Sequence, residues 1–194
     1  MNKIEVLNVE TQRYEAKECA KEATLNAEFF RLAFDEHLLF DISVINCTLP
    51  AYSYINDAKF RDCSFENVTF DQVTFSRCVF EQCTFRNCSF YCSDLRYSRI
   101  IACAFIDCHF EHANFVECAM DTCKGLMQFG PLGIHKRIGY AFVFKGKIYI
   151  KLGCWCGTYF QTVKTVKDAY AGNVHLKAYL AGLKYANEVC RLWL

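Results

Sequence analysis

The amino-acid sequence predicts a mainly β repeat protein, a coiled body followed by a small C-terminal β-β-α-α module. A large apolar residue recurs at every fifth position from Phe60 to Met120. A smaller uncharged residue stands two positions before each of them, from Ala58 to Cys118. The five-residue period stops after Gly130-Pro131, where alternating and helical patterns replace it. One main body plus an appendage is therefore expected within the 194 residues.

The two apolar rows require a chain that turns once in every five residues. A period of five fits neither the 3.6 residues of an α-helix nor the two of a β-strand, so no single element buries both rows. The large row is Phe60, Phe65, Phe70, Phe75, Phe80, Phe85, Phe90, Leu95, Ile100, Phe105, Phe110, Phe115 and Met120. The small row is Ala58, Cys63, Val68, Val73, Cys78, Cys83, Cys88, Ser93, Ser98, Cys103, Cys108, Ala113 and Cys118, with Cys123 after it.

This pattern resembles the pentapeptide-repeat family, whose consensus places a small residue two positions before a central Leu or Phe. The resemblance implies a right-handed quadrilateral β-helix, a solenoid in which four pentapeptides form one coil. Residues twenty apart would then stack at the strand spacing of about 4.8 Å. Phe65, Phe85 and Phe105 are expected in one interior column, and Cys63, Cys83, Cys103 and Cys123 in another.

Upstream, the same signature appears one residue out of phase. Its small and large pairs are Ala27/Phe29, Leu32/Phe34, His37/Leu39, Ile42/Val44, Cys47/Leu49 and Tyr52/Tyr54. One extra residue between Tyr54 and Phe60, in a bulge or small loop at a coil corner, would reconcile the two registers. The expected organisation is an N-terminal cap in residues 1–24, a β-helix of about five coils in residues 25–125, and a module in residues 126–194.

Most of the fourteen cysteines follow the five-residue period, so they are expected to be small buried hydrophobes. Disulfide or metal roles remain alternatives. Cys154 and Cys156 share one side of an extended segment and could pair with His135 or His175, as metal ligands or as a thiol and imidazole. Cys108, His109 and His112 alternate across the coil wall and are not expected to converge. The sequence assigns no catalytic residue, metal or cofactor, and an enzyme is the least favoured class.

The outward positions of the repeat would carry recognition. Their columns mix signs, and Arg61 with Glu81, and Glu66 with Arg86, are expected as cross-coil ion pairs. Five positions that are polar in neighbouring coils are instead apolar or aromatic, which is typical of an interface core. These candidate interaction residues are Tyr91, Tyr97, Ile101, Ile106 and Val116. Alternatively, the C-terminal segment folds back and covers them.

The C-terminal module shows its own patterns. Alternation over residues 138–153 predicts two strands joined by a turn at Gly146. Thr158 is the expected N-cap of a helix that buries Tyr159, Val163, Val166 and Tyr170, and Gly172-Asn173 ends it. A second helix from Asn173 carries one apolar stripe, and the stripe is Leu176, Leu180, Leu183, Asn187 and Cys190, with Tyr179 and Ala186 beside it.

This region also resembles a short module of phage and prophage reading frames. The matching residues are Gly153, Cys154, Trp155, Gly157 and Thr158 in a turn, then His175, Tyr179 and Leu180 in a helix. The resemblance covers about sixty residues and implies no known activity.

Charge is distributed unevenly along the chain. Residues 1–57 sum to −5, residues 58–123 to −3 and residues 124–194 to +9. Such asymmetry bears on partners and association. The basic set and the start of the first helix predict a phosphate or carboxylate site, formed by Lys136, Arg137, Lys145, Lys147, Lys151, Gly157 and Thr158. The lysines could instead be solvated, or complement the acidic rod of a second copy.

These features favour a protein-binding scaffold, phage-derived and acting on a host protein. Family members that resemble this chain include quinolone-resistance proteins, which bind DNA gyrase as mimics of duplex DNA, so gyrase is a candidate partner. That role requires a continuous acidic surface, which the mixed columns do not supply. Nucleic acid or phospholigands at the basic module, and a homo-oligomer, remain further alternatives. The charged N-terminal decade and the short apolar runs predict a soluble cytoplasmic protein with no membrane partner.

Overall fold

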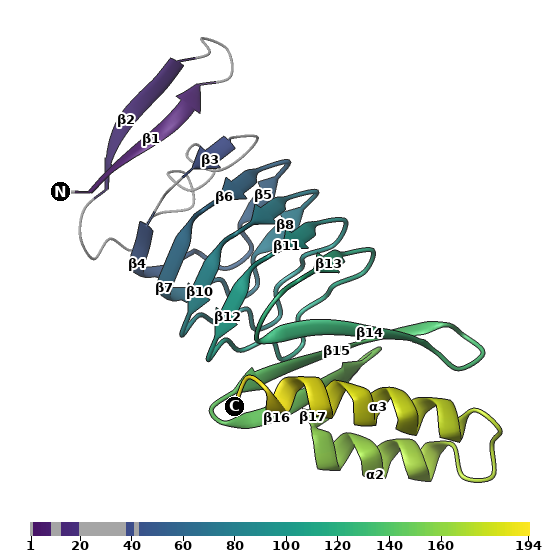
Figure 1. Ribbon diagram of the computed structural model, residues 1–194. Helices are drawn as coiled ribbons and strands as arrows, with labels where there is room; N and C mark the ends of the chain where they lie inside the picture. The colour runs from purple at the N-terminus through teal and green to yellow at the C-terminus, as the bar shows by residue number, and fades with distance from the viewer. Residues whose placement is uncertain (1, 9–12, 20–37, 41–42) are drawn as a thin grey trace. The chain divides into compact units, whose positions relative to one another are not determined.

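The computed structural model describes residues 2–8, 13–19, 38–40 and 43–194 (Figure 1), and the side chains from residue 44 onward. The chain divides into two compact units, residues 1–123 and residues 124–194, which are described separately. Among the expected early pairs, Ala27/Phe29 and Leu32/Phe34 lie outside the described residues, as does most of the expected cap-to-coil junction. No helix in the described part of the chain is long and apolar enough to cross a membrane.

The first unit is a β-solenoid, as the sequence predicted, and it has about four turns where about five coils were expected. Its short strands stack in parallel on successive coils, and the partners between Lys59 and Asp121 lie twenty residues apart. The strands are β3 (Leu38–Phe40), β4 (Ser43–Thr48), β5 (Tyr54–Asn56), β6 (Lys59–Arg61), β7 (Ser64–Thr69), β8 (Thr74–Ser76), β9 (Val79–Glu81), β10 (Thr84–Arg86), β11 (Arg99–Ile101), β12 (Ala104–Ile106) and β13 (Ala119–Asp121).

The coil has four sides. Side 1 holds β3, β6, β9, β11 and β13, and side 2 holds β4, β7, β10 and β12. Side 3 is held by single bridges that join Thr69, Ser89 and His109. Side 4 holds β5 and β8, continued by bridges from Thr74 to Asp94 and Asn114. An antiparallel hairpin of β1 (Asn2–Asn8) and β2 (Arg13–Cys19) extends the sheet of side 1, because β1 pairs with β3.

Left-handed residues make the corners. Every fifth residue from Asp57 to Thr122 has a positive φ, between 51° and 60°. No glycine occupies these positions, although L-residues adopt this conformation at a cost and Asn and Asp adopt it most readily. Five of the fourteen are Asp or Asn, namely Asp57, Asp62, Asn67, Asn87 and Asp107. Hydrogen bonds between coils offset part of this cost. On side 2, the Asn87 side chain donates to the Asn67 side chain at 2.7 Å.

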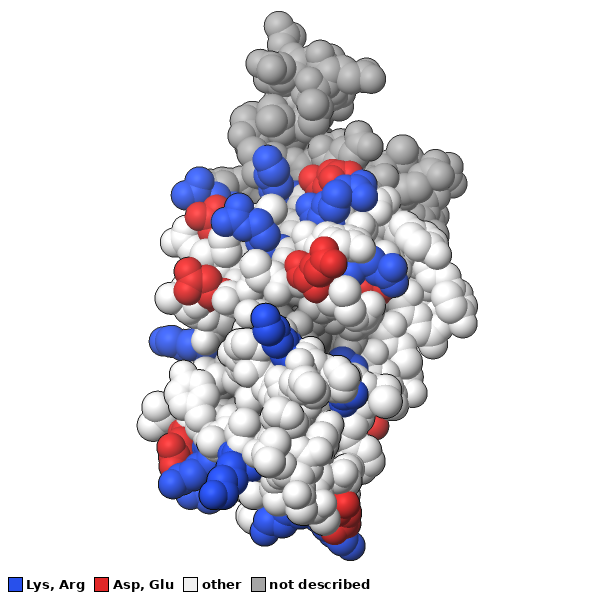
Figure 2. All heavy atoms as spheres, turned by 90° about the vertical axis from the view of Figure 1, so that its right-hand side faces the viewer, with Lys and Arg blue, Asp and Glu red and all other residues white. Residues whose placement is uncertain are grey.

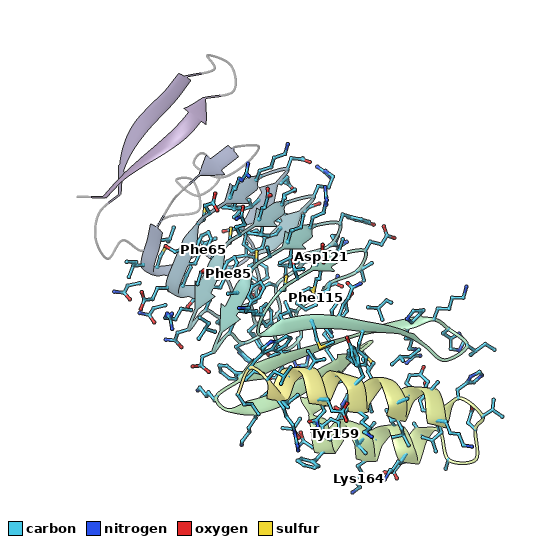
Figure 3. All side chains as sticks on the ribbon, viewed as in Figure 1. Phe65, Phe85, Phe115, Asp121, Tyr159 and Lys164 are labelled. Carbon is cyan, nitrogen blue, oxygen red and sulfur yellow. The ribbon has the colours of Figure 1, made fainter. Side chains whose placement is uncertain are left out.

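Phenylalanine stacks fill the interior, and two of their members are labelled in Figure 3. The rings of Phe65 and Phe85 lie parallel with centroids 4.8 Å apart, and those of Phe85 and Phe105 lie 4.9 Å apart. Rings on adjacent sides meet edge to face, as Phe85 and Phe90 do at 5.5 Å. Both geometries suit the aromatic quadrupole, so the predicted Phe column is confirmed and is closely packed.

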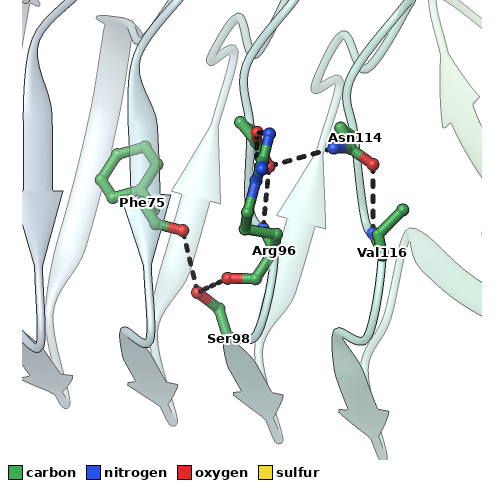
Figure 4. Close-up of polar contacts among 6 residues, drawn as sticks. Phe75, Arg96, Ser98, Asn114 and Val116 are labelled. Carbon is green, nitrogen blue, oxygen red and sulfur yellow. Dashed lines mark hydrogen bonds and ion pairs between the residues drawn. The ribbon is translucent and has the colours of Figure 1, made fainter.

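The small row also bonds to the backbone. The thiol of Cys103 donates to the carbonyl of Phe80 at 3.4 Å, and the hydroxyl of Ser98 donates to the carbonyl of Phe75 at 3.1 Å. Figure 4 shows the serine contact. A short Cys or Ser is therefore small enough for the corner and polar enough to satisfy a carbonyl that points inward. The predicted Cys column is confirmed in position, and its members Cys83, Cys103 and Cys123 are thiols.

Burial favours the protonated thiol at Cys118 and Cys123, two residues of the small row. It raises the pKa of Cys118 to about 12 and that of Cys123 to about 11. Below about pH 9 the thiols are neutral in both the folded and the unfolded chain, so their stabilising effect is complete. Above pH 9 the unfolded thiols ionise first, and stability falls as the pH rises through the folded-state values.

We therefore expect the free energy of unfolding to fall between pH 9 and 11, by up to about 1.4 kcal/mol for each pKa unit of difference. Guanidinium unfolding followed by circular dichroism at several pH values measures this. Cys118→Ala is the control, because Ala113 already occupies the same row. This variant should lose less stability over the same range, and equal losses in the two proteins would contradict the assignment.

The extra residue of the first coil lies elsewhere than expected. Leu49 is buried as the counterpart of Phe70, but Tyr52 and Tyr54 are 75% and 63% exposed. Ile55, paired with Phe75, is the buried residue of that side. The offset between coils changes from 21 residues at Thr48 to 20 at Tyr54. The insertion therefore lies in the turn at Pro50-Ala51, and the predicted inward pair Tyr52/Tyr54 is wrong.

The second unit is a four-stranded antiparallel sheet with two helices. The sheet runs in the order β14 (Leu126–Leu132), β15 (Arg137–Phe144), β16 (Lys147–Leu152) and β17 (Trp155–Thr158). The helices α2 (Tyr159–Ala169) and α3 (Leu176–Arg191) follow. The β-β-α-α order was thus incomplete, since β14 and β17 flank the predicted hairpin. Gly130 and Pro131 inside β14, and the short Cys-Gly segment of β17, hide the strand pattern.

Local signals of the second unit are confirmed. Lys145 and Gly146 form the hairpin turn with φ values of 48° and 66°, a conformation that favours glycine. The hydroxyl of Thr158 accepts from the amide of Gln161 while the Gln161 side chain accepts from the amide of Thr158, a capping box. One core joins the sheet and helices, with Ile150, Leu183 and Cys190 fully buried.

Candidate functional site

The five candidate interaction residues are distributed around the solenoid. Tyr91 lies on side 3, Val116 on side 4, Tyr97 at the corner that ends side 4, Ile101 on side 1 and Ile106 on side 2. Val116 is 55% exposed, Tyr97 50%, Ile106 38% and Tyr91 36%, and Ile101 is half-buried. Only Tyr97 and Val116 are direct neighbours, since the amide of Tyr97 donates to the carbonyl of Val116 at 3.1 Å. The five residues therefore do not form one patch.

The tyrosines, in contrast, gather on two neighbouring sides. Tyr91 lies on side 3 and Tyr97 at the end of side 4 of one coil, and Tyr52 and Tyr54 lie at the corner and on side 4 of an earlier coil. These four residues, the tyrosine surface, are all the tyrosines between residues 44 and 123, and each is at least 36% exposed. Sequence reasoning missed Tyr52 and Tyr54 because it placed them inside.

Two histidines adjoin Tyr91 on side 3. The imidazole of His109 stacks on the Tyr91 ring with centroids 5.9 Å apart, and His112 meets that ring edge-on at 5.7 Å. Both imidazoles approach the carboxylate of Glu111, at 3.2 Å and 3.7 Å. Cys108, His109 and His112 were not expected to converge; Cys108 is buried, but the two histidines meet at Glu111. His109 and His112 lie on either side of the buried Phe110 in the sequence, and both imidazoles contact the Tyr91 ring on the outer surface.

Side 4 carries a connected polar network beside Tyr97. Asp94 forms an ion pair with Arg96 and accepts a hydrogen bond from Asn114 at 3.2 Å (Figure 4). In the corner column that also holds Tyr97, Arg77 donates twice to Asp57, at 2.7 Å and 2.6 Å. These bonds hold the pKa of the Asp57 carboxyl below its usual value. The network fixes the long side chains around Tyr97, so the surface is presented in one arrangement.

The outer charges do not form an acidic stripe. The predicted pair of Arg61 and Glu81 is present at 3.8 Å. Glu66 and Arg86 are register partners, and no ion pair joins them in the described part of the chain. Acidic and basic side chains are intermixed on the solenoid face that Figure 2 shows. The surface thus differs from the continuous negative charge of duplex DNA.

The predicted anion-site residues divide between two ends of the second unit. Lys136 directly precedes β15 and Arg137 begins it, and Lys151 donates to the carbonyl of Gly153 at 3.0 Å at the same end of the sheet. Lys145 and Lys147 flank the opposite turn. Gly157 pairs with Ile150 inside the sheet. The seven residues therefore do not converge on one ligand.

At the turn end, however, Lys147 and Thr158 line a common pocket of about 420 Å³. Arg191, at the end of α3, lines it too. Sequence reasoning missed Arg191 because its distance of 44 positions from Lys147 gives no local signal. The spacing of Asn187 and Arg191, four positions apart on one helical face, was the only trace.

Cysteines and histidines of the second unit do not assemble a metal site. Within the described residues, no three His, Cys, Asp or Glu side chains group as metal ligands. Trp155, between the two cysteines, donates from its indole to the hydroxyl of Thr162 at 3.1 Å. Cys154 is exposed and Cys156 half-buried, which favours a packing role for this segment around Trp155.

The five-residue period and the four-sided parallel coil together define a β-solenoid of the class that the resemblance to pentapeptide-repeat proteins implies. A family model described as the SV2A/B/C luminal domain matches residues 51–110, which all belong to the repeat. No curated protein matches the chain by sequence.

Two solved structures are similar to part of the chain. One is the pentapeptide repeat protein Rfr23 from the cyanobacterium Cyanothece 51142, with 8% identity over 45% of this chain and 58% of that chain, and a TM-score of 0.43. The other is a trypsin-treated form of QnrB1, a plasmid-mediated fluoroquinolone resistance protein, with 12% identity over 46% of this chain and 66% of that chain, and a TM-score of 0.22. The chain spans less than two thirds of each of these proteins.

Proposed function

We propose that the solenoid is a non-enzymatic scaffold that binds a partner protein through the tyrosine surface. The observation that carries this proposal is the gathering of Tyr52, Tyr54, Tyr91 and Tyr97 on sides 3 and 4, while sides 1 and 2 of the described coils carry no tyrosine. Tyrosine is enriched in interface cores and among residues that dominate binding energy, because it buries a large ring and keeps a hydrogen-bonding tip.

A rigid support strengthens the proposal. The tyrosine rings project from coils whose interior is filled by stacked Phe rings. The ion pair of Arg77 with Asp57 restrains the side chains beside Tyr97. Surfaces fixed before binding lose little side-chain entropy when the partner arrives. Neighbouring Val116 and the imidazole of His112 widen the surface.

A DNA-mimic role on gyrase is less favoured. Duplex DNA carries about one negative charge per 1.7 Å of its axis. Residues 58–123 carry six basic residues against nine acidic ones, and Arg61 and Arg77 neutralise carboxylates on the outer wall. We therefore propose that the tyrosine surface recognises its partner through aromatic contacts and not through negative charge. The resemblance of residues 153–180 to a phage module supports a search for that partner among the proteins of a host cell.

Site-specific cross-linking tests the proposal. A photoreactive phenylalanine analogue at Tyr97 should capture one defined protein from cells that express the chain, and the same analogue at Arg86 on side 2 should not. The captured protein, once purified, should bind the unmodified chain directly. Capture at Arg86 but not at Tyr97 would place the binding surface elsewhere, and a partner that binds only a second copy of the chain would make the surface a homo-oligomer interface.

A further inference from the structure

The pocket of the second unit has the composition of a ligand site. It lies where the β15–β16 turn, the start of α2 and the end of α3 meet, and Tyr159 at its wall is labelled in Figure 3. Its volume of about 420 Å³ is within the range of about 300–1,000 Å³ of small-molecule sites. The lining residues are Gly146, Lys147, Ile148, Thr158, Tyr159, Phe160, Asn187, Arg191 and Leu194.

The charged side chains of this lining are both basic. Lys147 and Arg191 line the pocket, and no Asp or Glu is among the lining residues. Within the part of the chain that the structure describes, neither cation is in an ion pair, although Lys184 on the same helix pairs with Glu188 at 3.8 Å. Two basic side chains that line one pocket raise the positive potential inside it, which favours a bound anion.

The other part of the lining is apolar and unusually exposed. Phe160 is 76% exposed and Leu194 63%, while Ile148 at the floor is 8% exposed. Phe160 takes no part in the core of the unit, which its neighbour Tyr159 joins. An exposed ring on the first turn of a helix, beside a pocket, is positioned to cover an apolar ligand body.

The helix start is not the source of the site. Thr158 and Gln161 already satisfy one another in the capping box, so the side chains at this terminus are engaged. The anionic group must instead be held by the two cations. A guanidinium fork pairs bidentately with a carboxylate, and the lysine supplies a point charge beside it.

We propose that this pocket binds a small amphipathic anion, an organic carboxylate whose head lies between Lys147 and Arg191 and whose apolar body rests on Phe160 and Leu194. The site is independent of the partner surface on the solenoid, because none of its lining residues belongs to the first unit.

Isothermal titration with decanoate on the full chain tests this proposal. We expect saturable binding with one site, no binding of acetate, which lacks the body, and no binding of decyltrimethylammonium, which reverses the head charge. The double variant Lys147→Glu with Arg191→Glu should weaken decanoate binding at least about tenfold. Lys164→Glu with Lys177→Glu is the matched control, because both lysines are exposed and neither lines the pocket (Lys164 is labelled in Figure 3).

Three outcomes would overturn the proposal. They are the absence of decanoate binding at millimolar concentration, equal binding of the decyl cation, and equal weakening by the control variant. Lys147→Ser with Arg191→Ser guards against misfolding of the charge-reversed protein, and it must show the same loss with an unchanged circular dichroism spectrum. Asn187→Trp, which fills the pocket and keeps both cations, should also abolish binding.

Discussion

Phe85→Ala is expected to lower the free energy of unfolding by about 3–5 kcal/mol. Phe85 is 1% exposed and is sandwiched between Phe65 and Phe105, with centroids 4.8 Å and 4.9 Å away. Its removal leaves a cavity at the centre of the stack and interrupts contacts to the coil on each side. Because solenoid repeats are stabilised mainly by their neighbours, the loss should weaken the coupling between coils. Guanidinium unfolding followed by circular dichroism measures both effects.

Phe85→Leu is the matched control, since Leu95 already occupies the large row. It keeps most of the volume and should cost less than half as much as alanine. A broader transition for Phe85→Ala would indicate that the coils on either side unfold separately. If Phe85→Ala lowered the free energy of unfolding by less than about 1 kcal/mol, the close packing of the Phe stack would be contradicted, because so small an effect is typical of exposed residues.

Gly139→Val is expected to destabilise the second unit by about 3 kcal/mol or more. A Cβ at Gly139 would lie 2.4 Å from the Phe129 ring and 2.8 Å from the side chain of Leu152. Both neighbours belong to the core between sheet and helices, so neither side chain has space to withdraw. Hydrogen exchange should show faster exchange in β14, β15 and α3, while amides of β7 and β10 in the first unit keep their protection.

Gly146→Asn provides the comparison for this variant. Nothing lies within 4 Å of a Cβ at Gly146, and Asn tolerates its φ of 66° better than most residues. This change should cost less than about 1 kcal/mol. Similar losses for the two glycine variants would mean that backbone conformation, rather than packing at Gly139, sets the stability of the sheet.

The sequence was sufficient to predict the solenoid because its signal is repeated many times. Thirteen large residues at a fixed spacing leave no alternative to a turning chain, and the columns through Phe65 and Cys63 follow from the twenty-residue stack. Turn and cap chemistry was equally readable. Gly146 and Thr158 each have a local physical reason to stand at a turn and at a helix start.

Other features depend on contacts that the hydrophobic pattern does not encode. The insertion at Pro50-Ala51 was misplaced because Tyr54 resembles an inward residue, yet Ile55 beside it is the one that packs. Corner residues are left-handed without glycine, since cross-coil bonds such as that of Asn87 to Asn67 stabilise them. Such bonds join positions twenty residues apart and leave no local trace.

The sequence could predict which residues are candidates for binding, but not which of them lie together on one surface. The sequence singled out Tyr91 and Tyr97, and the assignment of each column to a side then showed that Ile101 and Ile106 lie away from them. Likewise Lys147 was predicted from strand alternation, whereas Arg191 joins it only through the packing of α3 beside the hairpin. Which residues share a surface is decided by tertiary packing between segments that are distant in the sequence.

The measurement that bears most directly on the partner surface is the affinity of the captured protein for two double variants. Tyr91→Ala with Tyr97→Ala should raise the dissociation constant by about thirtyfold or more, the effect of losing about 2 kcal/mol at an interface centre. Ile45→Ala with Ile106→Ala, two exposed apolar residues of side 2, should leave it within about threefold. Unchanged binding of the tyrosine variant, or equal weakening by both, would contradict the proposal that sides 3 and 4 form the binding surface.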